Sequence, residues 1–234
     1  MAAKKTLDAE PTAGGVRARV RAELTAEIKA AAGRQMTESG ASGLSLRAIA
    51  RELEMASSAI YRYFASRDEL LTALIIDAYD DLGSTVEAAV AEVADRDPVD
   101  RFVVLARAVR TWAVTNPNQY ALIYGSPVPG YAAPEATIAS ATRVPRALLA
   151  LLLDGHETET PIETDELAQA LGGLVEFTGR SIEVEALARG VEVWAELFGL
   201  VSLELFGHFV NVVSDPEVFF ERAALAMATR ALES

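Results

Sequence analysis

The sequence predicts an all-α protein of about ten helices, and three observations support this fold class. Apolar residues recur at spacings of three and four along most of the 234 residues, as they do on one face of a helix. Pairs that favour helix starts, such as Asp97 followed by Pro98, stand directly before several of these periodic segments. No segment alternates polar and apolar residues with the period of two that a half-buried strand requires.

The N-terminal part of the chain is predicted to contain an arm and three helices. Residues 1–15 are small, polar and interrupted by Gly and Pro, so we expect a disordered arm. A helix is expected to begin at Val16 and to end at Gly40. Ser45 then caps a short helix, and after a break a second short helix is expected over residues 57–63.

The remaining helices follow from the same start and stop signals. Ser66 and Glu69 have the spacing of a capping box and therefore predict that a long helix begins there. The stretch from Gly125 to Pro134 holds two Gly and three Pro and is expected to be a loop. Pro145 is expected to kink a helix or to mark its true start. The predicted helices span residues 67–94, 98–115, 137–153, 164–178, 184–209 and 216 onward.

The charges are unevenly distributed along the chain. The net charge is −13, but residues 1–76 carry 11 Lys and Arg against 9 Asp and Glu, a net charge of +2. Residues 77–234 carry the other 10 basic and 25 acidic residues, a net charge of −15. Because binding to nucleic acid depends on the Lys and Arg that reach phosphates, the acidic total does not exclude an N-terminal nucleic-acid site.

The composition argues against several other classes of protein. There is no cysteine, and the two histidines, His156 and His208, are not expected to bind a metal. Charges interrupt every apolar run before the roughly 18 residues of a membrane span, and no signal peptide is recognisable, so we expect a cytoplasmic protein. No catalytic or phosphate-binding motif is present, so we expect no enzyme activity and no cofactor.

Two short helices joined by a tight turn, with a longer helix before them, are typical of a helix-turn-helix unit. Its inner faces would be apolar, formed by Ile49, Leu53, Ile60 and Phe64, and its second short helix would enter the major groove. Hydroxyls and an Arg on the outer face can bond phosphates and base edges. The spacing alone does not define such a unit, since many helical proteins contain short helix pairs.

The order of the residues is more specific. The segment LSLRAIARELEMASSAIYRYFASRDELL resembles the helix-turn-helix of the TetR family along its full length. This family comprises dimeric repressors whose C-terminal domain binds a small molecule and then releases the operator. Glu54 departs from the family pattern where a Gly usually stands, and Ala56 where a capping Ser or Thr usually stands. By resemblance, the DNA-facing positions are Ser45, Arg47, Ser57, Ser58, Tyr61, Arg62, Tyr63 and Arg67.

The resemblance implies an arm at 1–15, a DNA-binding domain at 16–66 and an effector-binding and dimerisation domain at 67–234. More weakly, VEVWAELFGLVSLELFGHF resembles a TetR subgroup marked by a Trp…His-Gly signature, here Trp194 with Phe198-Gly199. An effector pocket should be mostly apolar with a few polar groups. Ordinary core packing remains the alternative for each aromatic, and an ion pair with Glu176 is the favoured role of Arg180. The candidate ligand-binding residues are Trp112, Tyr120, Tyr124, Phe177, Arg180, Trp194 and Phe198.

Dimerisation is expected because twofold symmetry matches a palindromic operator. The segment from 184 onward carries a coiled-coil-like seam, which forms either the dimer interface or part of the subunit's own core. The seam residues considered are Leu187, Val191, Val201, Leu205, His208 and Val212.

The expected partners are palindromic double-stranded DNA, a hydrophobic or aromatic small molecule, and a second copy of the chain. The helix over residues 67–94 joins the two domains, so we expect it to carry the signal between them. A ligand shifts such a two-state equilibrium only through its differential affinity for the two states. Two alternatives remain open: a DNA-binding regulator or activator without an effector, and an all-helical enzyme or carrier.

Overall fold

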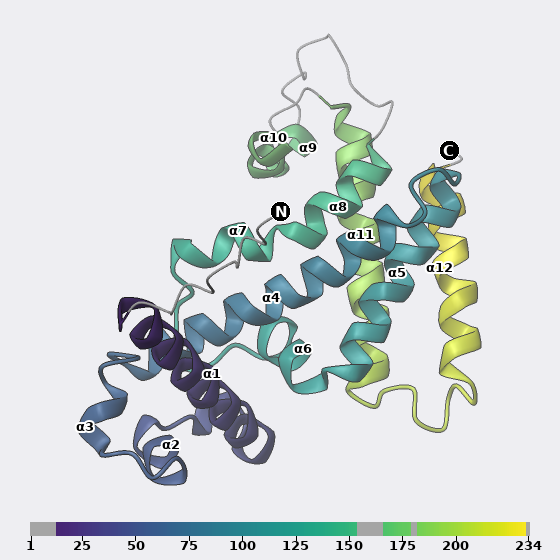
Figure 1. Cartoon of the computed structure of the whole chain (residues 1–234). Helices are drawn as coiled ribbons and strands as arrows, with labels where there is room; N and C mark the ends of the chain where they lie inside the picture. Colours follow the sequence, from purple (N-terminus) through teal and green to yellow (C-terminus); the bar gives the residue numbers. More distant parts are fainter. Residues whose placement is uncertain (1–12, 154–165, 179–181, 233–234) are drawn as a thin grey trace, which may run out of the picture. The chain divides into compact units, whose positions relative to one another are not determined.

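The computed structural model describes residues 13–153, 166–178 and 182–232, and over these residues the fold is all-α, as predicted (Figure 1). The described residues form twelve α-helices, nine of which have seven residues or more, and two short 3-10 helices. In chain order the elements are α1 (Ala13–Ser39), η1 (Ala41–Gly43), α2 (Leu46–Glu52), α3 (Ser57–Ile60), α4 (Arg67–Ala91), α5 (Pro98–Thr115), α6 (Pro117–Tyr124), η2 (Glu135–Thr137), α7 (Ile138–Ala141), α8 (Arg143–Leu152), α9 (Glu166–Ala170), α10 (Gly172–Thr178), α11 (Val184–Leu205) and α12 (Pro216–Leu232).

The chain divides into two compact units. Unit 1 comprises the residues up to Leu74 together with the loop Val128–Tyr131, and unit 2 comprises Ile75–Pro127 and the residues from Ala132 onward. The division falls inside α4, so this helix contributes its first two turns to unit 1 and the remainder to unit 2. None of the helices that the structure describes combines the length and apolar character needed to cross a membrane.

In unit 1, α1 begins earlier than predicted and the next helix starts are as predicted. Residues 13–15 belong to α1 rather than to the arm. The first N–H groups of a helix have no partner within it, so Gly14 and Gly15 disturb few hydrogen bonds at this position. Ser45 Oγ accepts a hydrogen bond from the backbone N–H of Ala48 (3.4 Å) and caps α2. Residues 1–12 of the predicted arm lie outside the described residues.

The predicted start of α4 at Ser66 is confirmed, and Glu69 bonds the residue before the cap rather than the cap itself. Ser66 Oγ accepts a hydrogen bond from the N–H of Glu69 (3.1 Å), and the Glu69 carboxylate accepts one from the N–H of Ala65 (2.6 Å). The loop of unit 1 is fixed to the same helix, since the hydroxyls of Thr72 and Tyr131 lie 2.9 Å apart. The start of α4 is therefore held from both sides.

The unusual residue Glu54 forms the C-terminal cap of α2. Its φ is 52°, in the left-handed region that favours glycine. The N–H of Met55 donates to the carbonyl of Ala50 (2.8 Å) and that of Glu54 to the carbonyl of Arg51 (3.2 Å), which together make a Schellman motif. Glu54 thus adopts the backbone conformation for which the family pattern has a glycine.

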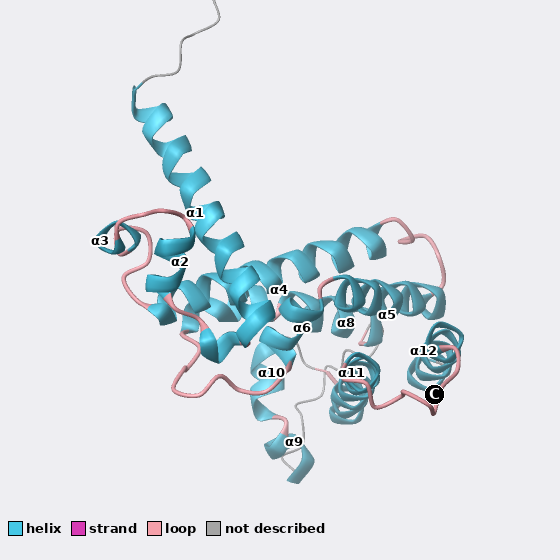
Figure 2. Cartoon of the chain, turned by 90° about the horizontal axis from the view of Figure 1, so that it is seen from below, coloured by secondary structure: helices cyan, strands magenta, loops and turns pink. Residues whose placement is uncertain are grey.

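In unit 2, α5 lies along α12 and also packs on α8 and α11 (Figures 1 and 2). The predicted starts are confirmed: Asp97 accepts a hydrogen bond from the N–H of Asp100, and Asp215 from that of Val218, both at 3.0 Å. The helix α6 was not predicted, because it has only eight residues. The largest fully buried side chains of this core are Tyr120, Phe102, Phe220, Leu82, Leu105 and Leu148.

Three other helix boundaries differ from the prediction. The segment around Pro145 is divided at Thr142, so α8 starts two residues before the proline, where proline is tolerated. The helix expected to end at Thr178 is divided at Leu171 into α9 and α10, and its expected cap, Thr164, lies outside the described residues.

The third difference is that α11 ends at Leu205 instead of continuing to residue 209. Gly207 adopts a φ of 81°, and the N–H of His208 donates to the carbonyl of Leu203 (2.9 Å). This second Schellman motif terminates the helix although the apolar spacing continues to Val212. The predicted seam therefore does not run along one continuous helix.

Arginine side chains join the helices of unit 2. Arg110 of α5 makes two hydrogen bonds to Glu204 of α11, at 2.7 and 2.8 Å, and both side chains are mostly buried. Arg143 of α8 bonds Glu87 and Asp80 of α4. The hydrogen bond from Arg143 lowers the pKa of Glu87, and the same bond raises the pKa of Arg143.

Candidate functional sites

The candidate DNA-reading segment comprises residues 57–63. It begins with α3 and continues into turns. The predicted helix over residues 57–63 is shorter than expected, since α3 ends at Ile60. The N–H groups of Arg62 and Tyr63 bond the carbonyls three residues before them, at 3.1 and 2.9 Å. Ala56 occupies the N-cap position of α3, and its methyl side chain makes no capping hydrogen bond.

Most of the predicted DNA-facing side chains are exposed. Arg47, Ser57, Ser58, Tyr61 and Arg62 are exposed, and Tyr61 keeps 44% of its surface accessible although it is a large aromatic residue. Beneath them, the apolar faces of the two short helices are packed, and Ile49 and Ile60 are completely buried. An exposed polar face on a packed apolar base is the arrangement that a helix-turn-helix requires.

The other predicted DNA-facing residues have roles inside unit 1. Ser45 caps α2 and its backbone N–H donates to Gln35 Oε1 (2.7 Å). The Arg67 guanidinium donates to the carbonyl of Ala41 (3.0 Å) and lies 3.4 Å from Asp68, so it joins the start of α4 to η1. The guanidinium of Arg67 has further N–H groups, so its contact with a DNA phosphate stays a prediction.

Sequence reasoning missed Arg21, which lies beside the reading segment. Arg21 Nη2 donates a hydrogen bond to the backbone carbonyl of Arg62 (3.0 Å). The same guanidinium lies over the ring of Tyr63, with its carbon 5.2 Å from the ring centroid. Nothing in the sequence around position 21 indicates these contacts, because they join residues 41 and 42 positions apart.

The candidate effector site in unit 2 is an apolar cavity of about 270 Å³. Ligand pockets in proteins are mostly roughly 300–1,000 Å³, so this cavity lies just below the lower end of that range and has room only for a small occupant. Trp194, a predicted ligand-binding residue, forms part of its wall. Gly190 belongs to the wall as well, and a Cβ there would lie 2.8 Å from Leu149 Cδ2. The residues around the cavity are Pro145, Leu148, Leu149, Leu174, Gly190, Val191 and Trp194.

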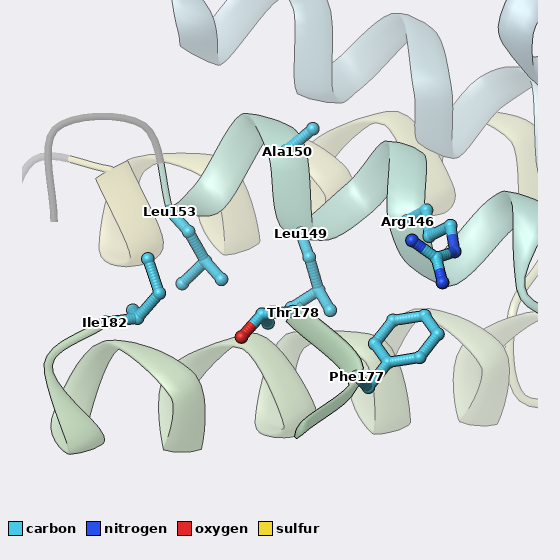
Figure 3. Close-up of a pocket in the computed structure, with 7 residues that line it drawn as sticks. All are labelled: Arg146, Leu149, Ala150, Leu153, Phe177, Thr178 and Ile182. Carbon is cyan, nitrogen blue, oxygen red and sulfur yellow. The ribbon is translucent and has the colours of Figure 1, made fainter. Parts of the chain in front are cut away.

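A smaller pocket of about 130 Å³ shares Leu149 with this cavity and adds polar groups (Figure 3). Phe177, another predicted ligand-binding residue, lines it, and the Arg146 guanidinium carbon lies 4.4 Å from the centroid of the Phe177 ring. Thr178 completes the polar part of this pocket. A ligand with an apolar body and a polar end would therefore find both environments around Leu149.

Four of the predicted ligand-binding aromatics form one cluster. The Tyr124 ring lies 4.4 Å from Phe198 and 5.1 Å from Tyr120, and Phe198 lies 5.6 Å from Trp194, between ring centroids. Tyr120 is fully buried, and its hydroxyl contacts the carbonyl of Phe198 (3.1 Å) and Ser202 Oγ (2.8 Å). Burial raises the pKa of Tyr124, so its phenol is neutral at physiological pH.

Three of the predicted ligand-binding residues, Trp112, Tyr120 and Phe198, line none of the three pockets described for this unit. Trp112 is a core residue whose Nε1 donates to Asp81 (2.7 Å), as the core-packing alternative anticipated. Arg180 lies outside the described residues. A third pocket, of about 420 Å³, is lined by Tyr124, Ser126, Ser202 and Phe206 among others.

The predicted dimer residues are in different environments. Leu187 and Val201 are buried in the core of their own subunit, and Leu205 packs against that core. Val191 borders the apolar cavity, while His208 and Val212 follow the end of α11. Among the described residues, no group of three or more His, Asp and Glu is placed to hold a metal, and His156 lies outside them.

These features define a helical DNA-binding regulator with a separate cavity-bearing unit. Two family models match the chain: residues 28–74 match the model for bacterial regulatory proteins of the tetR family, and residues 102–227 match that for a tetracyclin repressor-like C-terminal domain. The chain therefore belongs to the TetR family of transcriptional regulators and binds DNA through its helix-turn-helix.

Individual relatives agree with this assignment. The HTH-type transcriptional regulator Rv1816 of Mycobacterium tuberculosis is 44% identical over 214 residues, which cover 88% of this chain and 92% of the relative. The crystal structure of the regulatory protein SCO4313 has a TM-score of 0.74 at 36% identity, with 90% of this chain and 98% of that chain covered. RolR in complex with resorcinol has a TM-score of 0.50 at 20% identity, with 93% and 95% covered.

Proposed function

We propose that this protein is a homodimeric repressor that leaves its operator when a small apolar or aromatic molecule occupies the cavity in unit 2. The observation that carries the ligand response is the cavity itself, whose lining side chains are all apolar or aromatic. Such a cavity disfavours water and favours a neutral, hydrophobic occupant. RolR, a protein of the same fold, is known in complex with resorcinol.

In this proposal, the exposed face of the reading segment contacts the operator. Arg62 supplies donors for guanine or phosphate, and the hydroxyls of Ser57, Ser58 and Tyr61 supply further hydrogen bonds. Arg47, near the start of α2, provides a phosphate contact from the supporting helix.

DNA binding is tested with duplexes selected from a random library by the wild-type protein. We expect the double variant Arg62→Ala, Tyr63→Ala to bind the selected duplex about 100-fold more weakly, because each lost base or phosphate contact weakens binding substantially. The control is Arg96→Gln, an exposed arginine of unit 2, which should have no effect. Equal affinity of the double variant and the wild type would contradict the assigned reading face.

The ligand response is tested with a set of monocyclic aromatic and short-chain hydrophobic compounds. Trp194 lines the cavity, so an occupant should alter tryptophan fluorescence, raise Tm and release the operator duplex. Val191→Phe should fill the cavity and abolish release, while operator binding remains. Val114→Phe, at an exposed valine of α5, is the matched control. Release that persists in Val191→Phe would exclude this cavity as the effector site.

For the dimer, we propose a face formed by α11, α12 and the turn between them. Its support is a group of apolar side chains that the single subunit leaves exposed: Leu203, Phe206, Val210, Val218, Phe219 and Leu225. Burial of such a group by a second copy would remove apolar surface from water.

Sedimentation velocity tests this face. Leu225→Glu should shift the protein from dimer to monomer and weaken its binding to a palindromic duplex, whereas Val114→Glu should do neither. A monomeric wild-type protein would contradict the homodimer, and a dimeric Leu225→Glu variant would exclude the proposed face.

A further inference from the structure

The end of the reading segment needs support from outside its own helix. Because α3 has only four residues, the chain after Ile60 continues in turns, and the carbonyl of Arg62 finds its partner elsewhere. The partner is Arg21 of α1, whose Nη2 lies 3.0 Å from that carbonyl oxygen. A charged donor on a backbone carbonyl fixes the orientation of the adjoining peptide.

The same guanidinium also holds the next residue. Its carbon lies 5.2 Å from the centroid of the half-buried Tyr63 ring, within the range of a cation–π interaction. One side chain of α1 therefore contacts two consecutive residues of the segment, one through its backbone and the other through its ring.

We propose that Arg21 is a positioning residue for operator recognition, which holds Arg62 and Tyr63 in the conformation that reads DNA. This inference rests on the proposed role of these two residues in DNA contact. Because base contacts specify the sequence whereas phosphate contacts hold any DNA, loss of Arg21 weakens binding to the operator more than binding to unrelated DNA.

The experiment compares Arg21→Gln with Arg19→Gln. Arg19 lies on the same helix and pairs with Glu23 of that helix (3.6 Å), so both variants lose one positive charge from α1. Affinity is measured for a duplex selected by the wild-type protein and for a scrambled duplex, at several salt concentrations. We expect Arg21→Gln to bind the selected duplex about tenfold more weakly than the wild type does. Its affinity for the scrambled duplex, and the salt dependence of its binding, should equal those of the Arg19→Gln control.

Two further variants separate positioning from folding. Arg21→Lys keeps a donor for the Arg62 carbonyl and a cation near the Tyr63 ring, so it should recover part of the affinity. Thermal melting should give nearly the same Tm for Arg21→Gln and wild type, because the side chain is exposed. In a Tyr63→Leu background the effect of Arg21→Gln should be smaller than in the wild type.

Three results would overturn the proposal. If Arg21→Gln loses the same affinity for both duplexes, and its plot of log affinity against log salt is less steep than that of Arg19→Gln by about one, Arg21 is a direct phosphate contact. Unchanged affinity for the selected duplex would remove any role in recognition. If the wild-type protein selects no duplex, the proposed operator recognition fails first and the positioning role fails with it.

Discussion

The two compact units present their candidate sites in opposite ways. In unit 1 the site is a set of exposed polar side chains that come from about twenty consecutive residues and stand on a buried apolar base. In unit 2 it is an apolar cavity whose walls come from three helices, α8, α10 and α11, with lining residues spread from Pro145 to Trp194. The first kind of site follows from local structure, and the second kind exists only after the helices have packed.

The largest difference between the units should appear when a large side chain is truncated. Tyr120→Ala should lower the free energy of unfolding of unit 2 by about 4 kcal/mol, because the residue is fully buried and contacts two other aromatic rings. Tyr61→Ala, at an exposed tyrosine of unit 1, should change the free energy of unfolding of unit 1 by less than about 0.5 kcal/mol. Both tryptophans lie in unit 2, so urea unfolding followed by tryptophan fluorescence reports on that unit, and hydrogen exchange of the amides of residues 28–64 reports on unit 1.

Hydrogen exchange shows whether the units respond separately to this change. In Tyr120→Ala, the amides of residues 28–64 should keep their protection at urea concentrations that unfold unit 2. Equal loss of protection in both units would mean that they unfold together, and the comparison would then describe two sites within one cooperative structure. Tyr120→Phe, which removes only the hydroxyl, should lower the free energy of unfolding by about 1 kcal/mol.

Ion pairs give the next largest contrast. Arg110 and Glu204 in unit 2 form two hydrogen bonds and keep only 17% and 14% of their side chains exposed, whereas Arg34 and Glu52 in unit 1 keep 57% and 41%. Breaking a largely buried pair leaves a charge without compensation, so Arg110→Gln should lower the free energy of unfolding by about 2 kcal/mol.

The matched variant is Arg34→Gln, which should cost less than about 0.5 kcal/mol, since exposed pairs are screened by water. Urea unfolding, followed by circular dichroism, measures both variants. Similar losses in the two variants would show that burial does not distinguish the ion pairs of the two units.

The sequence predicted the starts of helices better than their ends. The starts at Ser45, Ser66, Asp97 and Asp215 depend on hydrogen bonds between residues three apart, so the local sequence is sufficient to predict them. The end of α11 was predicted wrongly, because the apolar spacing continues beyond the backbone signal of Gly207. The periodicity of side chains does not reveal where the backbone turns.

The candidate sites were predictable to different degrees for a related reason. The reading segment follows a pattern of consecutive residues, and five of its residues, Ser57, Ser58, Tyr61, Arg62 and Tyr63, were predicted from the order of the residues. In the cavity, Trp194 was identified because it is aromatic, but Leu149 and Pro145 were not. An apolar residue beside a cavity has the same sequence pattern as one in a filled core, so only the packed structure distinguishes them. The contact of Arg21 with Arg62 is long-range and was missed for the same reason.

The two Schellman caps allow a smaller, reciprocal test. Glu54 in unit 1 and Gly207 in unit 2 both adopt a positive φ, of 52° and 81°. Glu54→Gly should raise the stability of unit 1 by about 1 kcal/mol through relief of backbone strain, and Gly207→Ala should lower that of unit 2 by a similar amount. Hydrogen exchange measures the first change and tryptophan fluorescence the second.

Glu54→Ala is the control for charge at this cap. It removes the carboxylate but keeps a Cβ in the left-handed region, so it should give little of the gain seen with glycine. If alanine stabilises unit 1 as much as glycine does, the effect comes from charge and the backbone argument for this cap is wrong.

The smallest expected effect is a pH dependence confined to unit 2. The hydrogen bonds from Arg107, at 2.7 and 2.6 Å, lower the pKa of Glu221 in the folded protein. Since the unfolded chain then binds a proton at higher pH than the folded one does, this carboxylate stabilises the fold above its unfolded pKa of about 4.3. The contribution is lost as the pH falls through the lower, folded pKa.

Glu221→Gln removes this titration, so the free energy of unfolding of the variant should fall less steeply with decreasing pH below about 4.5 than that of the wild type. Arg107→Gln should flatten the curve in the same way, and the double variant should add little, because the two residues act through one contact. Urea unfolding by tryptophan fluorescence at a series of pH values measures the three curves. If the curve of Arg107→Gln stays parallel to that of the wild type, the low pKa of Glu221 does not arise from this pair.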